Sequence, residues 1–252
     1  MSPREREREG ERERRDLGQQ VEGRHAVREL LVARKRRVNE IWLSGDSDEI
    51  EQLAEETQVR IRRVPRDQLD RRARTDAPQG VVAFAAPIVP ADVDALLADR
   101  AAFLVALDGV TDPQNLGAVM RTAETAGATG MLLPRHRAVG ITPAVTKAAA
   151  GALEYLPVAF VSGIPGVLER AARAGVWCIG LDGGAKTSVF DLTLADQPLV
   201  LVLGAEGRGL SRLAAARCEV VASIPMHGHI ESLNVSAAAA IACAEIARRR
   251  SS

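Results

Sequence analysis

A polar turn at residues 224–236 separates an apolar run from a helix-forming stretch. Ser232, Asn234 and Ser236 carry oxygens that can accept hydrogen bonds from the free N–H groups at a helix start. Residues 237–247 are strong helix formers, and the arginines that follow suit the negative end of the helix dipole. Helix capping explains these side chains by itself, but a role in a chemical site stays open because two other polar turns also follow apolar runs.

The two other turns occupy residues 108–121 and 204–210. The first contains Asn115 and Arg121, and the second contains Glu206 among glycines. Neither has the GxGxxG spacing of a dinucleotide-binding turn, and one glycine-rich turn is weak evidence for phosphate binding. Because ligands of open α/β sheets bind at the carboxyl ends of the strands, the three turns predict one common site.

The turns belong to a region in which strand-length apolar runs alternate with helical segments. The runs are continuous rather than alternating, so the strands should be covered on both faces. This pattern predicts an α/β fold with a mostly parallel sheet and helices on each side. The expected strands are 103–107, 131–133, 158–161, 176–181, 199–203 and 220–224, and the expected helices are 115–126, 143–152, 165–174 and 210–216.

A smaller α/β module precedes this region. An amphipathic helix is expected from Val21, followed by strands at 39–44, 59–64 and 80–85 with helices between them. Residues 2–16 alternate opposite charges and have no apolar side chain to bury, which is typical of a disordered tail. The predicted organisation is a tail at 1–19, a small domain at 20–89, a linker at 90–101 and a second domain at 102–252.

The charge pattern limits the partners of the chain. The net charge is zero, with 33 basic and 33 acidic residues, so only a local basic patch could bind nucleic acid. Aromatic residues make up 3%, which disfavours modules that stack single-stranded RNA bases. Arginine suits phosphate binding, although a solvated basic face is an equal alternative. The candidate RNA-binding residues are Arg34, Lys35, Arg36, Arg62, Arg63 and Arg72.

The three cysteines, Cys178, Cys218 and Cys243, are far apart and lie in apolar or helical runs. They show no metal-ligand spacing, so we expect no metal and a reducing compartment. No apolar stretch reaches membrane-spanning length, and the first residues are charged where a signal peptide needs an apolar run. We therefore expect a cytoplasmic protein without membrane attachment.

Taken together, the three turns resemble motifs one, two and three of the SpoU family. This family comprises RNA ribose 2'-O-methyltransferases of the SPOUT superfamily. The matching stretches are DPQNLGAVMRTA, LVLGAEGRGL and IPM through SLNVS, in that order. The small module is similar to the substrate-binding domain of the family's ribosomal branch, through GRHAV at residue 23 and APQGVVA at residue 77. Members of the most similar branch modify a guanosine of large-subunit ribosomal RNA.

The resemblance implies a deep trefoil knot in the C-terminal part of the chain, a feature that general folding rules do not favour. It implies S-adenosylmethionine as the cofactor and a homodimer formed through the catalytic domain. The implied cofactor-binding residues are Gly204, Ile224, Met226 and Leu233. Ordinary core packing is the alternative for the three apolar side chains.

The resemblance also implies catalytic roles for Asn115, Arg121, Glu206, Ser232 and Asn234. A guanidinium is a very weak acid, so we assign Arg121 to phosphate binding and to stabilisation of the developing alkoxide, and leave the proton acceptor open. His227 and His229 are interpreted as loop residues. Two other functions remain possible, namely a transfer-RNA ribose methyltransferase and a catalytically silent RNA-binding protein.

Overall fold

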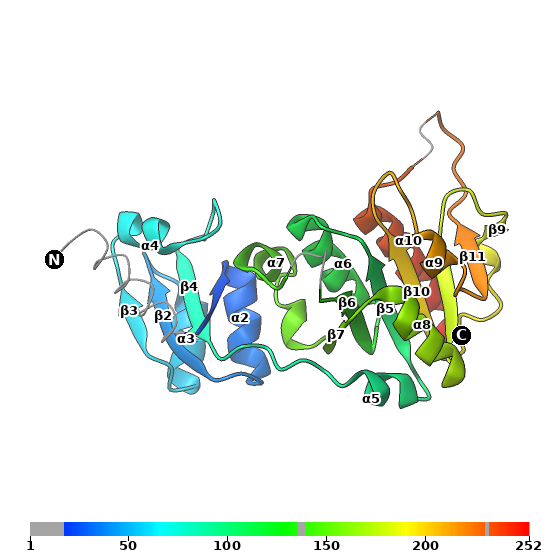
Figure 1. Ribbon diagram of the computed structural model, residues 1–252. Helices are drawn as coiled ribbons and strands as arrows, with labels where there is room; N and C mark the ends of the chain where they lie inside the picture. Colours follow the sequence, from blue (N-terminus) through cyan, green and yellow to red (C-terminus); the bar gives the residue numbers. More distant parts are fainter. Residues whose placement is uncertain (1–17, 136–139, 230–231, 252) are drawn as a thin grey trace, which may run out of the picture. The chain divides into compact units, whose positions relative to one another are not determined.

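The computed structural model describes residues 18–135, 140–229 and 232–251, and the chain forms two compact units. Unit 1 comprises residues 1–89 together with 142–154, and unit 2 comprises residues 90–141 together with 155–252. The tail predicted at residues 1–19 lies outside the described residues except for Gly18 and Gln19. Figure 1 shows the elements of both units.

Unit 1 is built on a four-stranded sheet with the order β1-β4-β2-β3. β4 runs antiparallel to both β1 and β2, whereas β2 and β3 are parallel. The carboxyl ends of β1, β2 and β3 therefore lie at the same edge. The strands are β1 (Gln19–Glu22), β2 (Val38–Leu43), β3 (Ile61–Arg63) and β4 (Val81–Ala85).

One face of this sheet is covered by α2 (Arg24–Ala33) and α3 (Asp48–Glu56). Val27 and Leu30 are fully buried, since a spacing of three to four residues places them on one side of α2. They share a core with Ile41 of β2, whose neighbours in the strand point to the opposite face. Burial of this apolar face explains why the small unit has a core of its own.

The opposite face of the sheet is covered by α4 (Arg66–Arg72), which buries Leu69 against Trp42 and Phe84. The rings of Trp42 and Phe84 meet edge to face with their centroids 5.8 Å apart. The guanidinium of Arg72 lies 4.9 Å from the centre of the Phe84 ring. Aromatic side chains thus form a second, smaller core that is bordered by arginines.

The segment 142–154 belongs to unit 1 although it follows the second strand of the larger sheet. It contains α7 (Pro143–Ala148) and the 3-10 helix η1 (Ala152–Glu154), which pack against β1 and α2. Arg36 donates from Nε to Glu154 Oε2 at 2.9 Å, and the two side chains are 6% and 4% exposed. An ion pair buried to this extent fixes the segment in place, because either charge alone would be left without water.

Unit 2 is built on a seven-stranded sheet with the order β7-β6-β5-β10-β8-β11-β9. Every neighbouring pair in it is parallel. The strands are β5 (Phe103–Asp108), β6 (Gly130–Pro134), β7 (Val158–Val161), β8 (Trp177–Leu181), β9 (Thr187–Ser188), β10 (Leu199–Gly204) and β11 (Val220–Ser223).

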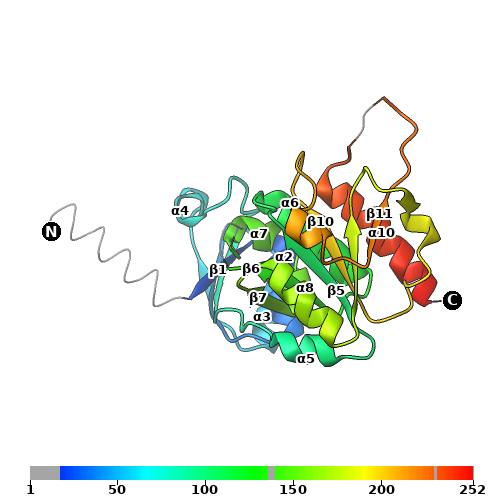
Figure 2. The same cartoon turned by 45° about the vertical axis from the view of Figure 1, so that its right-hand side comes forward.

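Helices cover both faces of this sheet, as its continuous apolar strands require (Figure 2). Ala106 and Val202 point toward the face that is covered by α5, α8 and α9. The alternate residues Val105 and Leu203 point to the opposite face, where α6 and α10 pack against each other. The helices are α5 (Val93–Ala98), α6 (Pro113–Thr125), α8 (Ile164–Arg173), α9 (Arg212–Ala215) and α10 (Val235–Arg250), and η2 (Val189–Asp191) is a 3-10 helix.

The structure confirms the predicted fold class, a mostly parallel α/β sheet preceded by a small α/β domain. Three local features differ from the sequence-based expectation. Residues 19–22 form β1 rather than the start of a helix, the expected linker contains α5, and the segment 142–154 lies with unit 1. The trefoil knot stays a prediction.

Candidate active site

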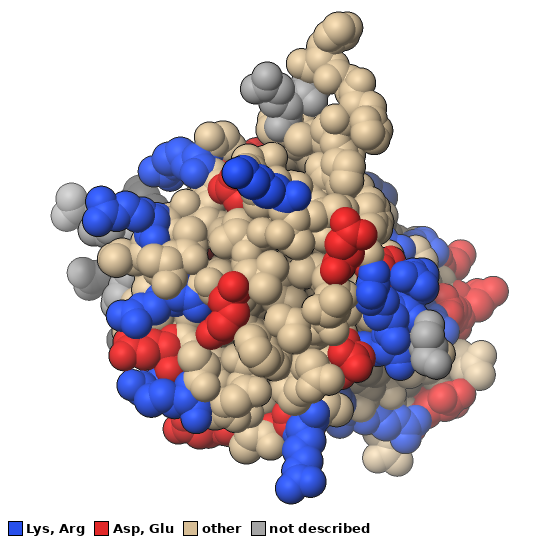
Figure 3. Space-filling view, turned by 90° about the vertical axis from the view of Figure 1, so that its right-hand side faces the viewer, with Lys and Arg blue, Asp and Glu red and all other residues tan. Residues whose placement is uncertain are grey.

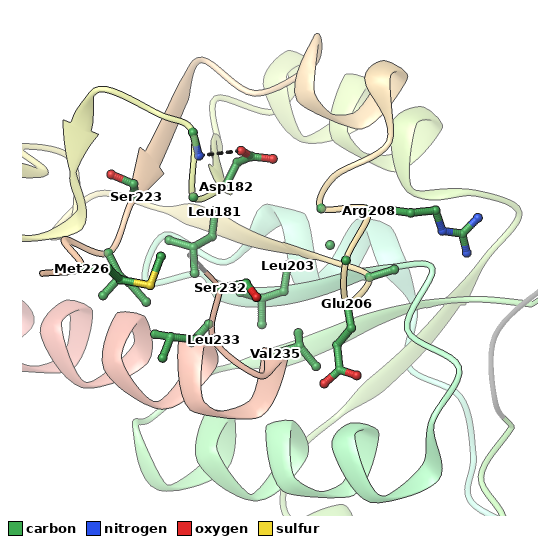
Figure 4. Close-up of a pocket in the computed structure, with 18 of the residues that line it drawn as sticks. Leu181, Asp182, Leu203, Glu206, Arg208, Ser223, Met226, Ser232, Leu233 and Val235 are labelled. Atoms are coloured by element: carbon green, nitrogen blue, oxygen red, sulfur yellow. Dashed lines mark hydrogen bonds between the residues drawn. The ribbon is translucent and has the colours of Figure 1, made fainter. Parts of the chain in front are cut away.

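Four adjacent parallel strands of unit 2 end at the same edge of the sheet and supply the turns of the site. β5 leads into α6, β10 ends at Gly204, β8 is followed by Asp182, and β11 ends at Ser223. The three turns singled out in the sequence are therefore neighbours in space. Figure 4 shows the residues that line the cavity at this edge.

Three of the five predicted catalytic residues form one hydrogen-bonded cluster. Asn115 donates from Nδ2 to Glu206 Oε1 at 3.1 Å. Asn234 donates from Nδ2 to Asn115 Oδ1 at 3.0 Å and also to Glu206 Oε1. Residues from three distant stretches of the chain thus meet around one carboxylate, which the two amides hold in a fixed orientation.

Helix starts place the two asparagines. Asp112 caps α6 by accepting from the backbone N–H of Asn115 at 2.8 Å, with Pro113 in the first turn. Asn234 caps α10 by accepting at Oδ1 from the Ser236 N–H at 2.8 Å. Asn234 therefore has both of the roles that the sequence left open, because its oxygen caps the helix while its nitrogen joins the cluster.

The turn after β10 is possible only with glycine at position 204. Ala205 and Gly209 exchange backbone hydrogen bonds of 3.1 and 2.9 Å, which folds the turn back on itself. A Cβ atom at Gly204 would lie 2.1 Å from the carbonyl carbon of Gly209. The close approach brings backbone groups to the cavity wall and positions Glu206 at the tip of the turn.

The cavity at this edge has a volume of about 780 Å³, within the usual range for small-molecule sites. All four predicted cofactor-binding residues line it: Gly204, Ile224, Met226 and Leu233. Ser232 lines it as well. In Figure 4 the side chains of Met226 and Leu233 lie at one end of the cavity, whereas Arg208 points away from it. Glycine backbone and apolar side chains are suited to a nucleoside-type cofactor.

Asp182 lines the same cavity and was not identified from the sequence. Its Oδ1 accepts from the Gly184 N–H at 2.9 Å (Figure 4). The sequence signal was its place directly after an apolar run, the same signal that marked the other turns. A single aspartate before two glycines reads as an ordinary turn, so the signal was too weak to single it out.

Arg121 lies on α6, six residues and less than two turns after Asn115, and is exposed. Its guanidinium makes no hydrogen bond or ion pair with the described residues. Six residues correspond to a rotation of about 240° around a helix, so Arg121 does not share the face on which Asn115 meets Glu206. The structure therefore leaves Arg121 available to a ligand but outside the hydrogen-bonded cluster.

The predicted RNA-binding residues are spread over unit 1. The guanidinium carbon of Arg62 lies over Trp42, 4.9 Å from the ring centroid, and that of Arg72 lies over both Trp42 and Phe84. Arg63 pairs with Asp46 at 3.2 Å at the carboxyl edge of the sheet. Arg34 and Lys35 are exposed and directly follow the C-terminal end of α2.

Arg36 does not fit the predicted RNA contact. Besides Glu154, its guanidinium binds Gln19 Oε1 at 2.9 Å and the carbonyl of Ala86 at 3.1 Å. A side chain that is 6% exposed and fully engaged inside the unit cannot reach a phosphate without breaking a buried ion pair. The sequence reveals a basic cluster but not which of its members turns inward.

The two stretches of unit 1 that carried the resemblance meet in space. The backbone N–H of Arg24 donates to Gln79 Oε1 at 2.9 Å, and Arg24 Nε donates to the Gln79 carbonyl at 3.3 Å. Gly23 and Gly80 have φ values of 94° and 77°, which L side chains rarely adopt. The loops after β1 and before β4 are therefore joined at the carboxyl edge of this sheet.

Within the described ranges, no three His, Cys, Asp or Glu side chains are placed to hold an ion. His227 and His229 are exposed on the loop after β11. No helix of the described residues is both long and apolar enough to cross a membrane.

Comparison with known proteins agrees with this geometry. Residues 102–244 match the model of the SpoU rRNA Methylase family, and residues 20–90 match "RNA 2'-O ribose methyltransferase substrate binding". The chain is 39% identical over 239 residues to the 23S rRNA (guanosine-2'-O-)-methyltransferase RlmB of Shewanella oneidensis, covering 91% of this chain and 97% of that protein. It is 37% identical to YacO of Bacillus subtilis, which is assigned by name to the TrmH family of tRNA/rRNA methyltransferases, over 91% and 95% of the two chains.

A solved structure shows the same arrangement of elements. The SpoU methyltransferase AviRb from Streptomyces viridochromogenes, in complex with the cofactor AdoMet, superposes with a TM-score of 0.78. It is 26% identical, and the match covers 92% of this chain and 90% of that one. Fold and site thus define an S-adenosylmethionine-dependent RNA ribose methyltransferase. The chain belongs to the SpoU rRNA methylase family.

Proposed function

We propose that this protein transfers the methyl group of S-adenosylmethionine to the ribose 2'-hydroxyl of a guanosine in large-subunit ribosomal RNA. The observation that carries the proposal is the cluster of Asn115, Glu206 and Asn234 beside a glycine-walled cavity. The guanosine assignment is supported by full-length similarity to proteins named for that reaction and by the substrate-binding match of unit 1.

In this reaction the 2'-oxygen forms a bond to the methyl carbon as the carbon–sulfur bond of the cofactor breaks, and the hydroxyl proton leaves. The bound cofactor supplies the activated methyl group. Holding the hydroxyl in line should provide much of the rate enhancement. We assign this positioning to Asn115, Glu206 and Asn234, since the amides fix the Glu206 carboxylate and leave its Oε2 without a hydrogen bond to the described residues.

We assign Arg121 and Ser232 to the substrate side of the site. Ser232 lines the cavity next to Leu233, and its hydroxyl can hydrogen bond to a ligand. The exposed guanidinium of Arg121 suits the phosphate that neighbours the target ribose, where its charge would also stabilise the developing alkoxide.

For RNA binding, we propose the exposed arginines of unit 1 that lie outside its core. Arg62 is the strongest candidate because it is exposed while its guanidinium lies over the Trp42 ring, 4.9 Å from the centroid. A guanidinium placed in this way loses little freedom when it binds a phosphate or stacks on a base. The exposed residues Arg34, Lys35 and Arg63 remain candidates, as does the half-buried Arg72 at the edge of the aromatic core, and Arg36 does not.

We also infer a homodimer formed through unit 2, which the family resemblance suggests. One face of α10 packs against α6, while the small residues Ala237, Ala240 and Ala244 on its other side are exposed. Figure 3 views the side of the molecule on which β9 and β11 lie and shows an uncharged central area with charged side chains around its border. Light scattering tests the inference, and a strict monomer that still methylates RNA would contradict it.

Mapping of ribose methylation in total RNA, with and without the gene, tests the proposed function. We expect one 2'-O-methylguanosine of large-subunit ribosomal RNA to disappear with the gene and to return on complementation. Such a substrate would place the protein in the cytoplasm. Loss of a transfer-RNA modification instead would favour the tRNA enzyme, and an unchanged map would favour a silent RNA-binding protein.

A further inference from the structure

The Asp182 carboxylate has one oxygen committed to the protein and one directed to the cavity wall. Oδ1 accepts from the Gly184 N–H at 2.9 Å. Oδ2 lies beside Gly209, where an added Cβ would approach it to 2.7 Å, and it accepts no hydrogen bond from any residue in the described part of the chain. Asp182 is half-buried, and a carboxylate oxygen without a donor in the protein can accept hydrogen bonds from a ligand.

The backbone holds this carboxylate in a fixed place. The N–H of Asp182 donates to the carbonyl of Ala222 at 2.9 Å, and its carbonyl accepts from the Ala185 N–H at 3.2 Å. Asp182 is thus anchored between β11 and its own turn. A side chain held in this way loses little conformational freedom on binding a ligand, so its hydrogen bond to a ligand should be effective.

The strand order places Asp182 between the two ends of the cavity. Glu206, the member of the hydrogen-bonded cluster that lines the cavity, lies on the loop after β10, whereas Met226 and Leu233 lie beyond β11. Leu233 is 40% exposed, and it presents an apolar wall on which the flat adenine ring can pack. β8 separates β10 from β11, with about 5 Å between neighbouring strands. The part of the cofactor between its reactive group and its base is the ribose.

We propose that Asp182 determines cofactor specificity by accepting hydrogen bonds from the ribose hydroxyls of S-adenosylmethionine. A cis-diol offers two donors, and a carboxylate oxygen with free lone pairs can accept both. The proposal rests on the assignment of the cofactor and goes beyond it, because it gives one side chain a defined chemical group to recognise.

Binding of S-adenosylhomocysteine to the full-length protein and to Asp182→Asn, measured by calorimetry, tests the proposal. In the variant the amide oxygen can still accept from Gly184, so the turn is kept, while the amide nitrogen replaces Oδ2 and cannot accept. We expect the affinity to fall about tenfold or more, as for other hydrogen bonds to charged groups. Asp191→Asn, an exposed residue of η2 outside the cavity, removes the same charge and should bind normally.

Three further ligands identify the group that Asp182 contacts. Methylthioadenosine keeps the ribose and the base but lacks the amino-acid part. Asp182→Asn should therefore lower the affinity for it by the same factor as for S-adenosylhomocysteine. The 2'-deoxy and 3'-deoxy analogues of S-adenosylhomocysteine lack one donor each, so the difference between variant and wild type should shrink for at least one of them.

The other outcomes overturn the proposal in different ways. If Asp182→Asn lowers the affinity for S-adenosylhomocysteine but not for methylthioadenosine, Asp182 binds the amino-acid ammonium group. If Asp182→Asn lowers the affinity for both deoxy analogues as much as for S-adenosylhomocysteine, the ribose is not the group that Asp182 contacts. Equal affinities of the variant and the wild type for S-adenosylhomocysteine would show that Asp182 has no role. If the wild-type protein bound none of these ligands, the cofactor assignment would fail and this proposal with it.

Discussion

Asn234 shows how one side chain serves both folding and chemistry. Its oxygen caps α10, and its nitrogen donates to Asn115 and Glu206. An aspartate could cap the helix equally well but could not donate, and a serine could not span both partners. The requirement for an amide at this position therefore comes from the site and not from the helix.

Arg121 provides the test of mechanism at the residue scale. If it binds phosphate and stabilises the attacking oxygen, Arg121→Lys should retain more activity than Arg121→Ala while staying impaired, because the charge remains and the planar fork is lost. If deprotonated Arg121 were the base, the lysine variant should instead recover at high pH, since lysine deprotonates more easily. Single-turnover rates across pH, with cofactor affinity measured alongside, distinguish the two.

The matched control for Arg121 is Arg173→Ala, which removes an exposed arginine of α8 outside the cavity. It should methylate at the wild-type rate. Should Arg121→Ala also methylate at the wild-type rate, the role assigned to Arg121 is wrong, and Glu206 becomes the next candidate for the essential group.

The three cysteines are predicted to be chemically inert in the folded protein. Burial raises the pKa of each of the thiols Cys178, Cys218 and Cys243 to about 12. Since a raised pKa leaves almost no thiolate at pH 8, alkylation by iodoacetamide should be slow in the folded protein and fast after unfolding. Mass spectrometry of the alkylated chain measures this, and rapid labelling of native protein at pH 8 would contradict it.

At the scale of elements, the β10 turn should be the part of the site least tolerant of added volume. Gly204→Ala places a methyl group 2.1 Å from the Gly209 carbonyl carbon, so the turn must open. We expect the variant to lose at least about tenfold in cofactor affinity, and to unfold more easily, by roughly 1–3 kcal/mol as for other overpacked sites. Gly166→Ala in α8 is the control, because an added Cβ there meets nothing within 4 Å. It should stabilise the helix by about 0.5–1 kcal/mol.

The segment 142–154 gives a second test at this scale. Removing one member of a buried ion pair leaves the other charge uncompensated, so Arg36→Met should destabilise unit 1 by about 3 kcal/mol or more. The double variant Arg36→Met with Glu154→Met should be less destabilised than the single one. Denaturant unfolding measures both. Equal stability of Arg36→Met and wild type would show that the pair does not hold the segment.

Some elements could be predicted from the sequence because local pattern determines them. The apolar runs at 103–107 and 199–203 correctly predict β5 and β10, and the turns that follow these strands contain Asn115 and Glu206. The sequence does not predict β1, because the residues from Val21 onward also fit an amphipathic helix. Only the pairing of these residues with β4 favours the strand. The burial of Arg36 depends on Glu154, 118 residues away, which no local pattern reveals.

At the scale of the whole molecule, we expect unit 1 to bind the RNA and unit 2 to carry out the methyl transfer. Unit 2 supplies the cavity and the cluster, while unit 1 supplies the exposed arginines and the joined loops at Arg24 and Gln79. Each has its own core, so each can keep its site while the other changes. Substitutions at Arg62 should therefore weaken RNA methylation and leave cofactor affinity unchanged.

Methyl transfer by the purified protein to total RNA from cells that lack the gene tests the central claim most directly. With labelled S-adenosylmethionine and mapping of the product, we predict a single 2'-O-methylguanosine in large-subunit RNA. Asn234→Asp, which keeps the helix cap but loses the amide donor, should bind the cofactor and transfer methyl at least about a hundredfold more slowly. Label in transfer RNA alone, or no transfer by a wild-type protein that binds the cofactor, would contradict the account.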